Sequence, residues 1–584
     1  MTNLDLKAIL EKKAPDFLTK AHPYFMNIII KVVEKIIKLE FINRFLRNHH
    51  QNGFEFIEEL FDFLDFSYFV SSKDRKKIPA EGKLIIVANH PLGALDGLAL
   101  LNIIGEIRQD VKIVANDVLM NIDNLHELFL PYDVFNINSQ KENIKRIEEA
   151  LENEHAVIFF PAAEVARLTP KGIKDKKWNK GAIRFAQKFN CPILPIHIKA
   201  RNSWSFYLAS LLHKGFSTLL LPRQIFSNKH GKIVIRVGDP ISKEVFSKKI
   251  VNYKEQNKLL KKHVYKIGKG KSGIFETEKN IIHPCDAKII RNELERSELL
   301  KELPNGKRLF LVEYNSARNV LKEIARLREL TFRSVGEGTG EKKDFDVYDK
   351  YYKHIVLWDD KELEIIGSYR LGITKEILEN YGYRGLYNSG QFLFSRNFEP
   401  VLYRSVELGR SFIQKKYWRS KALDYLWQGI GAFLNMHPQI EYLFGAVSIS
   451  GSYSTHAQEM IVYYYEKWYK EERSFALPKN PFIISKNRRK EFENSFSGNS
   501  HTQDFINLKM MLRNTGFSVP VLLRKYSELC DYGGAKFLSF GIDESFSNSI
   551  DCMIVLDLKM VKNAQKERYY QKNNYPGDLE VIGN

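Results

Sequence analysis

The sequence has few cysteines, no long apolar run and no secretory pattern at its start. Its four cysteines are widely scattered without paired spacing, so neither a disulfide framework nor a zinc site is indicated, and a reducing cytosol is the simplest compartment. The first residues show no apolar core of the kind a signal peptide has. The longest apolar stretches, such as 25–33, are far shorter than the ~20 residues that a membrane-spanning helix needs. If the protein meets a membrane, we expect it to lie on the surface.

Acidic residues are the minority charge in this chain. Asp and Glu number 70 against 89 Lys and Arg, which gives a net charge of +19. A balance this basic favours a polyanionic partner, either an anionic bilayer or nucleic acid. The 44% hydrophobic and 12% aromatic content is enough for full-sized cores and excludes a largely disordered chain. At 584 residues, two or more domains are expected.

The order of apolar runs predicts two α/β domains after a helical N-terminal extension. In the extension, residues 1–75, apolar residues recur at helical spacing with lysines between them over 28–38. This helix either packs on the domain, which is the simpler interpretation, or lies in a lipid interface. Alternating strands and helices then indicate one α/β domain at 76–265, a basic linker at 266–305 and a second α/β domain at 306–584.

Short apolar runs give the expected strands of both domains. The expected strands are 84–88, 111–115, 156–160, 193–198 and 233–237 in the first domain, and 309–313, 354–358, 364–371, 442–448 and 552–556 in the second. The polar, Asn- and Ser-rich stretch 478–502 is expected to be one long loop.

The segment 89–97, Asn-His-Pro-Leu-Gly-Ala-Leu-Asp-Gly, follows directly on the expected strand 84–88. A strand's carboxyl end that meets a helix is the usual place for chemistry in an open α/β sheet. Asp96 can hold His90 in one tautomer, which leaves the other ring nitrogen as a general base for a hydroxyl or amine that attacks a thioester. An isolated His–Asp pair is more often a turn histidine beside a helix cap, so the setting has to support the catalytic interpretation.

A second polar block, 160–167, follows the expected strand 156–160. Its sequence is Phe-Pro-Ala-Ala-Glu-Val-Ala-Arg, and a lysine-rich loop comes after it. Glu164 and Arg167 beside such a loop suit a phosphate-bearing substrate, for example the phosphopantetheine arm of an acyl carrier protein. Alone the block is weak evidence, because lysine-rich loops are usually only solvated.

Together these blocks resemble the glycerolipid acyltransferase superfamily over about residues 75–245. Two departures, the five residues between His90 and Asp96 and the Ala-Ala-Glu at 162–164, resemble the branch that includes lyso-ornithine-lipid O-acyltransferases. A turn that holds Pro91 and Gly93 can absorb the extra residue. The resemblance implies catalysis by the His–Asp pair, and its substrate-binding positions are Asn89, Gly93, Asn116, Glu164 and Arg167.

In the C-terminal half, Arg328, Arg370 and Arg410 stand on three separate predicted elements, and Asp346 and Glu407 supply acids. A fold could gather them into one cleft that holds a zwitterion such as an amino acid. For any single one of these residues, a surface ion pair is the simpler interpretation.

The order of the C-terminal blocks resembles the acyl-homoserine-lactone-synthase-like branch of the GNAT fold, and within it the ornithine Nα-acyltransferases, over about residues 310–470. The matching segments are Leu327-Arg328 with Phe332, Phe345-Asp346, Gly367 with Arg370-Leu371, and Glu-Leu-Gly-Arg-Ser at 407–411. The resemblance implies that Glu407 and Asp346 orient or deprotonate an α-amine. It also implies that Arg328, Arg370 and Arg410 hold the carboxylate or shape the acyl-carrier contact. Asp344 stands one residue closer to Asp346 than the family pattern has it, which leaves its role open.

The two resemblances predict a bifunctional enzyme similar to the fused bacterial ornithine lipid synthases. The C-terminal domain would N-acylate an amino acid with a 3-hydroxyacyl chain, and the N-terminal domain would O-acylate the hydroxyl of that lyso-lipid. We expect acyl carrier protein thioesters as donors, no metal or further cofactor, and a cytoplasmic protein bound peripherally to the anionic inner face of the cell membrane. The amino-acid head group, the acyl length and the oligomeric state are not encoded in these motifs.

Two alternatives stay open. The first is a lysophosphatidate-type acyltransferase fused to a GNAT domain of another purpose. The second is a basic nucleic-acid-binding protein, which we do not expect because no recognition motif is evident and the basic residues do not alternate with aromatics in a strand-binding pattern.

Overall fold

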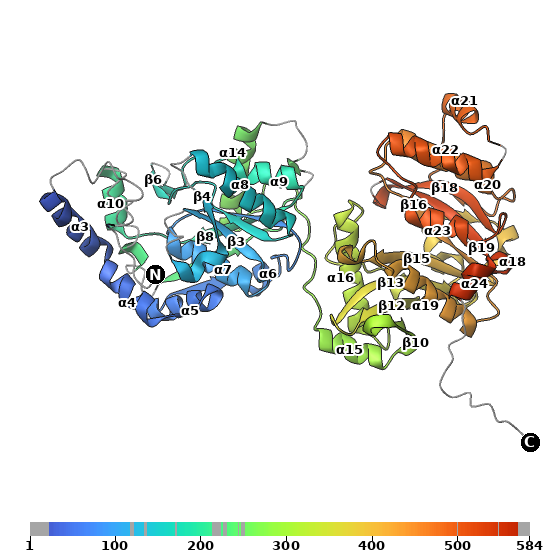
Figure 1. Cartoon of the computed structure of the whole chain (residues 1–584), viewed down its shortest axis with the longest axis horizontal. Coiled ribbons are helices and arrows are strands. Elements are labelled where there is room, and N and C mark those ends of the chain that lie inside the picture. The colour runs from blue at the N-terminus through green and yellow to red at the C-terminus, as the bar shows by residue number, and fades with distance from the viewer. Residues whose placement is uncertain are drawn as a thin grey trace, which may run out of the picture. The chain divides into compact units, whose positions relative to one another are not determined.

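The computed structural model describes Lys7 and residues 23–116, 122–132, 137–169, 172–212, 223–225, 231–242, 245–246, 252–498, 500–546 and 548–569. The chain folds into two compact units, Met1–His283 and Pro284–Asn584 (Figure 1). The boundary falls inside the segment 266–305 that the sequence predicts as a linker. Part of that segment, helix α15 (Ala287–Glu295) and strand β10 (Glu298–Leu303), packs in the second unit.

From residue 23 on, the described part of the N-terminal unit has three helices and then a seven-stranded sheet. The helices are α3 (Pro23–Ile37), α4 (Leu39–Asn48) and α5 (Gly53–Leu64). The sheet order is β1-β9-β8-β2-β5-β3-β4, and every neighbouring pair is parallel except β8 and β9. The strands are β1 (Ser67–Val70), β2 (Leu84–Ala88), β3 (Val111–Asn116), β4 (Phe129–Tyr132), β5 (Ala156–Phe159), β8 (Ile193–Lys199) and β9 (Lys232–Val237). The five strands expected in this domain are confirmed.

Helices cover both faces of this sheet. On one face, α5 and α7 (Ala94–Gly105) bury side chains such as Ile57 and Leu101 against β2. On the other face lie α8 (Ile137–Glu152), α9 (Gly181–Phe189) and α14 (Tyr253–Gly268). The apolar runs of the sequence are therefore strands buried on both sides. The carboxyl ends of β2 and β5 meet at one edge, directly before the two polar blocks.

The C-terminal unit holds an eight-stranded sheet in the order β10-β11-β12-β13-β15-β16-β19-β18. Its further strands are β11 (Lys307–Val312), β12 (Lys353–Asp359), β13 (Glu364–Ile373), β15 (Ser405–Ile413), β16 (Tyr442–Ile449), β18 (Ala535–Asp543) and β19 (Ser549–Asp557). The one parallel pair is β15 with β16, and it extends only over Ser405–Glu407 and Tyr442–Phe444. Beyond these residues the two strands have no ladder, so the sheet opens near its middle.

Helix α16 (Arg318–Ser334) covers one face of the C-terminal sheet. The other face carries α19 (Ala422–Met436), α20 (Thr455–Tyr469), α22 (His501–Asn514) and α23 (Val521–Leu529). The expectation of one long loop at 478–502 is wrong. Helix α21 (Lys486–Ser495) forms there because the Ser485 hydroxyl accepts a hydrogen bond from the Arg488 N–H and Phe492 is buried. Among the described residues, none of the helices combines the length and apolar content needed to cross a membrane.

Candidate active sites

His90 and Asp96 face each other at the carboxyl edge of the N-terminal sheet. The turn after β2 carries His90, and Asp96 lies in the first turn of α7. Nδ1 of His90 is 3.3 Å from Oδ2 of Asp96. The backbone N–H groups of Leu92 and Gly97 donate to the two oxygens of this buried carboxylate over 2.8 and 2.9 Å. Gly93 takes φ 106°, a left-handed conformation that favours glycine, and so lets the five-residue turn bring Asp96 back to the imidazole.

Three contacts fix His90 from its other sides. The ring of Phe160 stacks on the imidazole with 4.0 Å between ring centroids. The N–H of Ala166 donates to the carbonyl of His90 over 2.7 Å, so the second polar block packs directly on the first. The N–H of His90 donates to Asp175 over 3.3 Å, and Trp178 holds that carboxylate from the other side. Asp175 is not among the residues predicted from the sequence, where its only signal is that it is the lone acid in a lysine-rich loop.

The surroundings of His90 favour the protonated form of its imidazole. Burial lowers its pKa, but the nearby carboxylates of Asp96 and Asp175 more than compensate, so the pKa of His90 lies above its ordinary value. Nδ1 is buried towards Asp96, whereas 16% of the side chain is still exposed. The carboxylate therefore stabilises the imidazolium that forms when the ring takes a proton.

Asn89 is predicted from the sequence to bind substrate, but its side chain bonds to a neighbouring strand of the sheet. Its side-chain amide donates to the carbonyl of Ile198 over 2.9 Å and accepts from the N–H of the same residue over 2.7 Å. Because these bonds tie the end of β2 to β8, Asn89 fixes the turn that carries His90.

The remaining predicted positions of this half lie around the second block. Glu164 is 3.4 Å from Nζ of Lys176 and 3.9 Å from Nε of Arg167. Arg167 is buried, with its guanidinium 5.9 Å from the centre of the Phe206 ring. Asn116 ends β3, and its side chain lies outside the described residues.

In the C-terminal unit, Arg328 is held on several sides by two aspartates. Its Nε donates to Asp344 over 2.8 Å, and its two terminal nitrogens donate to the oxygens of Asp349 over 3.2 and 2.9 Å. Burial alone would raise the pKa of Asp349, but the guanidinium groups of Arg328 and Arg370 hold it well below its ordinary value. Arg328 is buried and each of its three nitrogens donates to Asp344 or Asp349, so it shapes the site.

Arg370 and Arg410 differ from Arg328 because each has one buried nitrogen without a hydrogen-bond partner among the described residues. Arg370 donates through Nη1 to Asp346 over 2.7 Å and to Asp349 over 3.0 Å, whereas its buried Nη2 has no hydrogen-bond partner among the described residues. Arg410 donates through Nη1 to Asp344 over 2.9 Å, and its Nε is likewise unpaired. Oδ2 of Asp346 also lacks a partner. Buried polar groups of this kind normally find partners, so two donors and one acceptor are available here for a ligand.

Arg410 also lies at a bulge in β15. Gly409 pairs with Arg370 and Phe412 with Ser368, so β15 has one residue more than β13 between these pairs. Arg410 takes φ 47° there, a conformation that costs a non-glycine residue about 1 kcal/mol or more. The bulge lies next to the place where β15 leaves β16.

Glu407 is buried and its carboxylate receives four donors. Oε1 accepts from the N–H and the side-chain amide of Asn388, each over 2.7 Å. Oε2 accepts from the Tyr352 hydroxyl and from the N–H of Tyr387. Burial raises the pKa of Glu407 despite these bonds. Four donors fill the acceptor positions of a carboxylate, so a substrate amine has no vacant position on Glu407, which differs from the prediction.

The bonds to Glu407 hold Tyr387 over the sheet. The Tyr387 ring centre is 4.5 Å from Cζ of Arg370 and 5.2 Å from Cζ of Arg410, within the range of cation–π attraction. A Cβ on Gly409 would be 3.9 Å from the same ring. In the segment Glu-Leu-Gly-Arg-Ser, the acid therefore anchors the tyrosine, the glycine lies beside its ring, and the arginine stacks on it.

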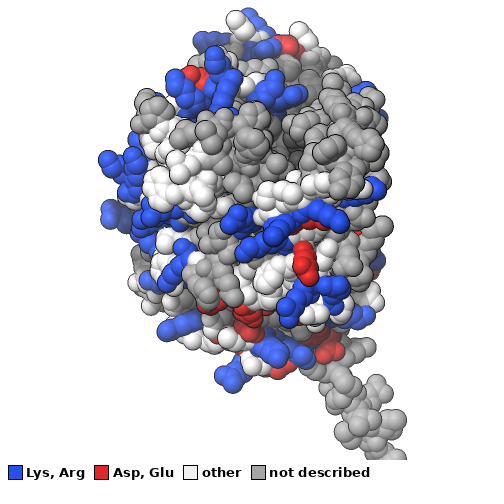
Figure 2. All heavy atoms as spheres, turned by 90° about the vertical axis from the view of Figure 1, so that its left-hand side faces the viewer, with Lys and Arg blue, Asp and Glu red and all other residues white. Residues whose placement is uncertain are grey.

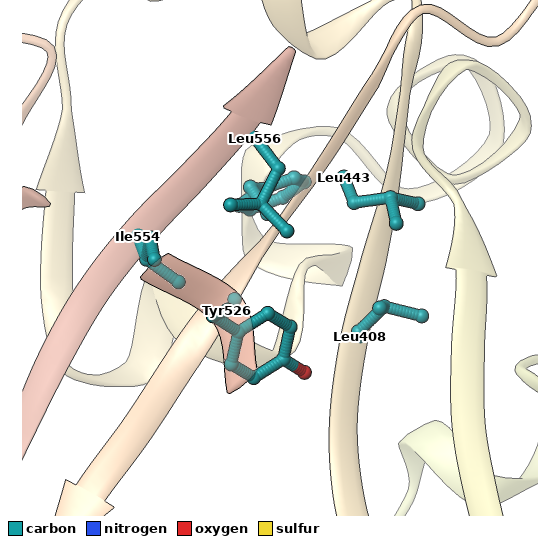
Figure 3. A pocket seen from close by; sticks show the side chains of 7 residues that line it. Leu408, Leu443, Tyr526, Ile554 and Leu556 are labelled. Carbon is teal, nitrogen blue, oxygen red and sulfur yellow. The ribbon is translucent and has the colours of Figure 1, made fainter. Parts of the chain in front are cut away.

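A small pocket, mostly apolar, lies beside the opening between β15 and β16. Figure 3 shows the residues around it, which are Leu408, Leu443, Phe444, Gly445, Tyr526, Ile554 and Leu556. A Cβ on Gly445 would come within 2.2 Å of the Leu408 carbonyl oxygen, so the two strands are in close contact just before they part. Within the described part of the chain, no group of three or more His, Cys, Asp or Glu side chains is placed to hold a metal ion.

Two family models match the chain, one in each unit. A model described as "Acyltransferase" matches residues 8–272, and a model described as "Acetyltransferase (GNAT) domain" matches residues 327–428. The chain therefore contains two acyl-transferring domains, one in each unit, as the sequence predicts.

Individual relatives carry both kinds of name. A glycine N(alpha)-acyltransferase of Phocaeicola vulgatus is 32% identical over 49% of this chain and 92% of its own length. A lyso-glycine lipid O-acyltransferase of the same organism is 29% identical over 42% of this chain and 88% of its own length. An L-ornithine N(alpha)-acyltransferase of Agrobacterium fabrum is 26% identical over 46% of this chain and 84% of its own length. Among solved structures, a CoA-dependent acyl-homoserine lactone synthase matches with a TM-score of 0.23 and 11% identity, over 44% of this chain and 83% of that chain.

Proposed function

The chain belongs to the acyltransferases of aminolipid synthesis, and we propose that it carries out both acylations of one aminolipid. The C-terminal unit N-acylates an amino acid with a 3-hydroxyacyl chain, and the N-terminal unit then O-acylates the hydroxyl of that lyso-lipid. The observation that carries this proposal is the pairing of a His90–Asp96 site in one unit with a balanced arginine–aspartate site in the other. Phocaeicola vulgatus has two separate proteins with the two names, and this chain is similar to both.

In the O-acylation step, His90 takes the proton of the lyso-lipid hydroxyl. The oxygen attacks the thioester carbonyl carbon, the C–S bond breaks with its electron pair on sulfur, and the thiolate is protonated as it leaves. Asp96 keeps the imidazole oriented and stabilises the imidazolium, Phe160 stacks on the ring, and Asp175 accepts from the backbone N–H of His90. Glu164, Arg167 and Lys176 lie on the next loop, where the cations can contact the phosphate of the acyl donor.

In the N-acylation step, the unpaired N–H groups of Arg370 and Arg410 bind the carboxylate of the amino acid. The free Oδ2 of Asp346 orients its ammonium group. Glu407 acts through Tyr387, because the tyrosine that it anchors packs against both guanidinium groups. No covalent enzyme intermediate is needed, since the amine attacks the thioester directly.

Acyl carrier protein thioesters are the proposed donors of both chains. Acyl carrier proteins are acidic, so the net charge of +19 would favour their encounter with this chain. Glycine is the first head group to test, because the two relatives named glycine N(alpha)-acyltransferase are 30–32% identical over 49% of this chain, whereas those named for ornithine are 26–31% identical over 21–46% of it.

The assay uses the purified full-length chain with 3-hydroxyacyl carrier protein and an amino acid, either glycine or ornithine. We expect an N-acyl amino acid first and an N,O-diacyl product after more acyl carrier protein thioester is added, both read by mass spectrometry. If the chain instead acylates lysophosphatidate and leaves amino acids untouched, the first alternative from the sequence is correct and the proposal fails.

The N-terminal helices offer a face for the membrane surface. Ile28, Val32 and Ile36 recur every four residues along α3 and are 44, 51 and 36% exposed, and Trp204 and Leu208 on α10 (Trp204–Leu212) are 63 and 61% exposed. Figure 2 looks at this side of the unit and shows many Lys and Arg side chains around uncharged surface. Exposed apolar side chains ringed by cations suit an anionic lipid interface.

Vesicle sedimentation tests this surface. We expect Val32→Glu to weaken binding of the chain to vesicles with 30 mol% anionic lipid by about tenfold, which corresponds to ~1.4 kcal/mol. The matched control is Ile483→Glu, the same kind of change at a 76% exposed side chain in the C-terminal unit, and it should bind like the wild type. Equal binding of all three proteins would exclude α3 as the contact.

A further inference from the structure

A row of four polar residues and two glycines crosses the C-terminal sheet on the face that carries Glu407. Side chains alternate between the faces of a strand, and Glu407 pairs with Phe444, so residues two, four or six places further along either strand share this face. The pairing registers then continue the row on both sides of the opening. The row consists of His354, Arg370 and Gly409 on β12, β13 and β15, and of Ser448, Asp551 and Gly541 on β16, β19 and β18.

The opening between β15 and β16 divides this row into two parts. On the β15 side are two cations, Arg370 and the bulged Arg410, and each has one nitrogen without a hydrogen-bond partner among the described residues. On the β16 side is a carboxylate, Asp551, which is 7% exposed. The hydroxyl of Ser448 donates to its Oδ1 over 2.7 Å.

Asp551 has an environment unlike that of the other acids of the site. Its pKa is raised to about 6, chiefly by burial; the hydrogen bond from Ser448 and the positive charge of Arg410 oppose the rise, and the acids Asp543 and Glu337 add to it. The negative charge of Asp551 in turn acts on the hydroxyl of Tyr387, which stacks on Arg410. The charges around Asp551 therefore belong to the same site as the arginines, on the far side of the opening.

The mechanism proposed above leaves one task without a residue, which is removal of the amine proton. Glu407 has its acceptor positions filled by four donors. Asp346 is paired through Oδ1 with Arg370. If Asp346 took up a proton, the three arginines of the site would face only two charged aspartates, Asp344 and Asp349, and the charges would no longer balance. Asp551 carries no such guanidinium pair, so it can gain a proton without breaking one.

We propose that Asp551 is the proton acceptor of the N-acylation step, a role that rests on the proposed function of this unit. Asp551 takes one proton from the bound ammonium group, and the neutral amine nitrogen then forms a bond to the thioester carbonyl carbon at the opening. The C–S bond breaks with its electron pair on sulfur, the second proton of the nitrogen passes to the leaving thiolate, and Asp551 releases its proton to water. Ser448 positions the carboxylate.

The test compares wild type with Asp551→Asn, a change that keeps the shape and can still accept the Ser448 hydrogen bond. With glycine and 3-hydroxyacyl carrier protein, we expect kcat of the variant to be about 100-fold lower at pH 7, as loss of a general base gives. The deficit should shrink as the pH rises towards the pKa of the free amine, because more of the amine then arrives neutral. Asp557→Asn, the same change at the other end of β19, is the matched control and should keep the wild-type rate.

A second variant gives a readout that a purely structural role would not move. Ser448→Ala removes a hydrogen bond that lowers the pKa of Asp551, so the rising limb of the pH–rate profile should move to higher pH. A rate within threefold of wild type for Asp551→Asn, or a deficit that is equal at every pH, overturns the assignment. If the wild-type chain forms no N-acyl product with glycine or ornithine, the proposed function itself fails and the assignment with it.

Discussion

The backbone N–H of Tyr387 donates to the carboxylate of Glu407 over 3.1 Å, and this bond ties a loop above the sheet to strand β15. The tyrosine that is held in this way packs on Arg370 and Arg410. Glu407 therefore contributes to the site through the position of its neighbours, and its contribution can be separated from direct contact with substrate.

Glu407→Gln should disrupt this loop. A glutamine has one acceptor oxygen and an amide that donates, so part of the four-donor arrangement is left unsatisfied, at a cost of ~1–3 kcal/mol. We expect a lower melting temperature, a raised KM for the amino acid and at least a tenfold loss of N-acylation, while O-acylation by the same chain stays intact.

A double-mutant cycle separates the positioning role from direct contact. Glu407→Gln and Tyr387→Ala should not be additive in kcat/KM, because the acid acts through the tyrosine. Additive effects would contradict this coupling and return Glu407 to a role of its own.

The rate of O-acylation should rise with pH through the pKa of His90. The base must be neutral to accept a proton, and Asp96 and Asp175 place the pKa of His90 above its ordinary value, so the rising limb should lie above pH ~6.5. Asp96→Asn removes a negative charge that favours the imidazolium, so the limb should move to lower pH while the maximal rate falls. A limb that stays in place in the variant would show that another group titrates.

Two glycines of the C-terminal site make a matched pair. Gly445→Ala puts a Cβ within 2.2 Å of the Leu408 carbonyl oxygen, so β15 and β16 must separate, and both the melting temperature and N-acylation should fall. In Gly409→Ala the nearest atom is Cδ1 of Tyr387 at 3.9 Å, an ordinary contact, so the melting temperature should stay within about 2 °C of wild type. Equal melting temperatures for the two variants would contradict the close strand contact.

The arginines should also respond differently to the same change. Arg328→Lys cannot reproduce the bonds to Asp344 and Asp349 and leaves buried carboxylates underpaired, which costs ~3–5 kcal/mol, so we expect poor folding. Arg410→Lys loses one bond at a less buried position and should fold, with a raised KM for the amino acid. Thermal unfolding and KM measured side by side check this difference.

The sequence predicts ten strands of the two large sheets, because most of them are buried on both faces and so appear as short apolar runs, and it misses β1, β4, β10, β15 and β18. The contact between His90 and Asp96 can also be predicted from the sequence, because a local turn with a glycine at positive φ is enough to bring the two side chains together. Helix α21 was missed because one buried aromatic, Phe492, and a serine cap decide it within a polar stretch.

The C-terminal site shows what a sequence pattern cannot supply. Asp551 shares its site with Arg410 only through the register of β16 and β19, which is set by strand pairing over more than a hundred residues. Sequence motifs also do not tell a saturated side chain from one with free donors. Arg328 and Arg370 stand in equally typical motifs, but only Arg370 keeps an unpaired nitrogen.

The most direct test of the two-step account is lipid mass spectrometry of a bacterial host that has no aminolipids of its own and expresses this chain. Wild type should yield a phosphorus-free diacyl aminolipid, His90→Ala should accumulate the monoacyl N-acyl form, and Glu407→Ala should yield neither. Full diacyl product from His90→Ala, or altered phosphatidic acid with no aminolipid from the wild type, would contradict the account.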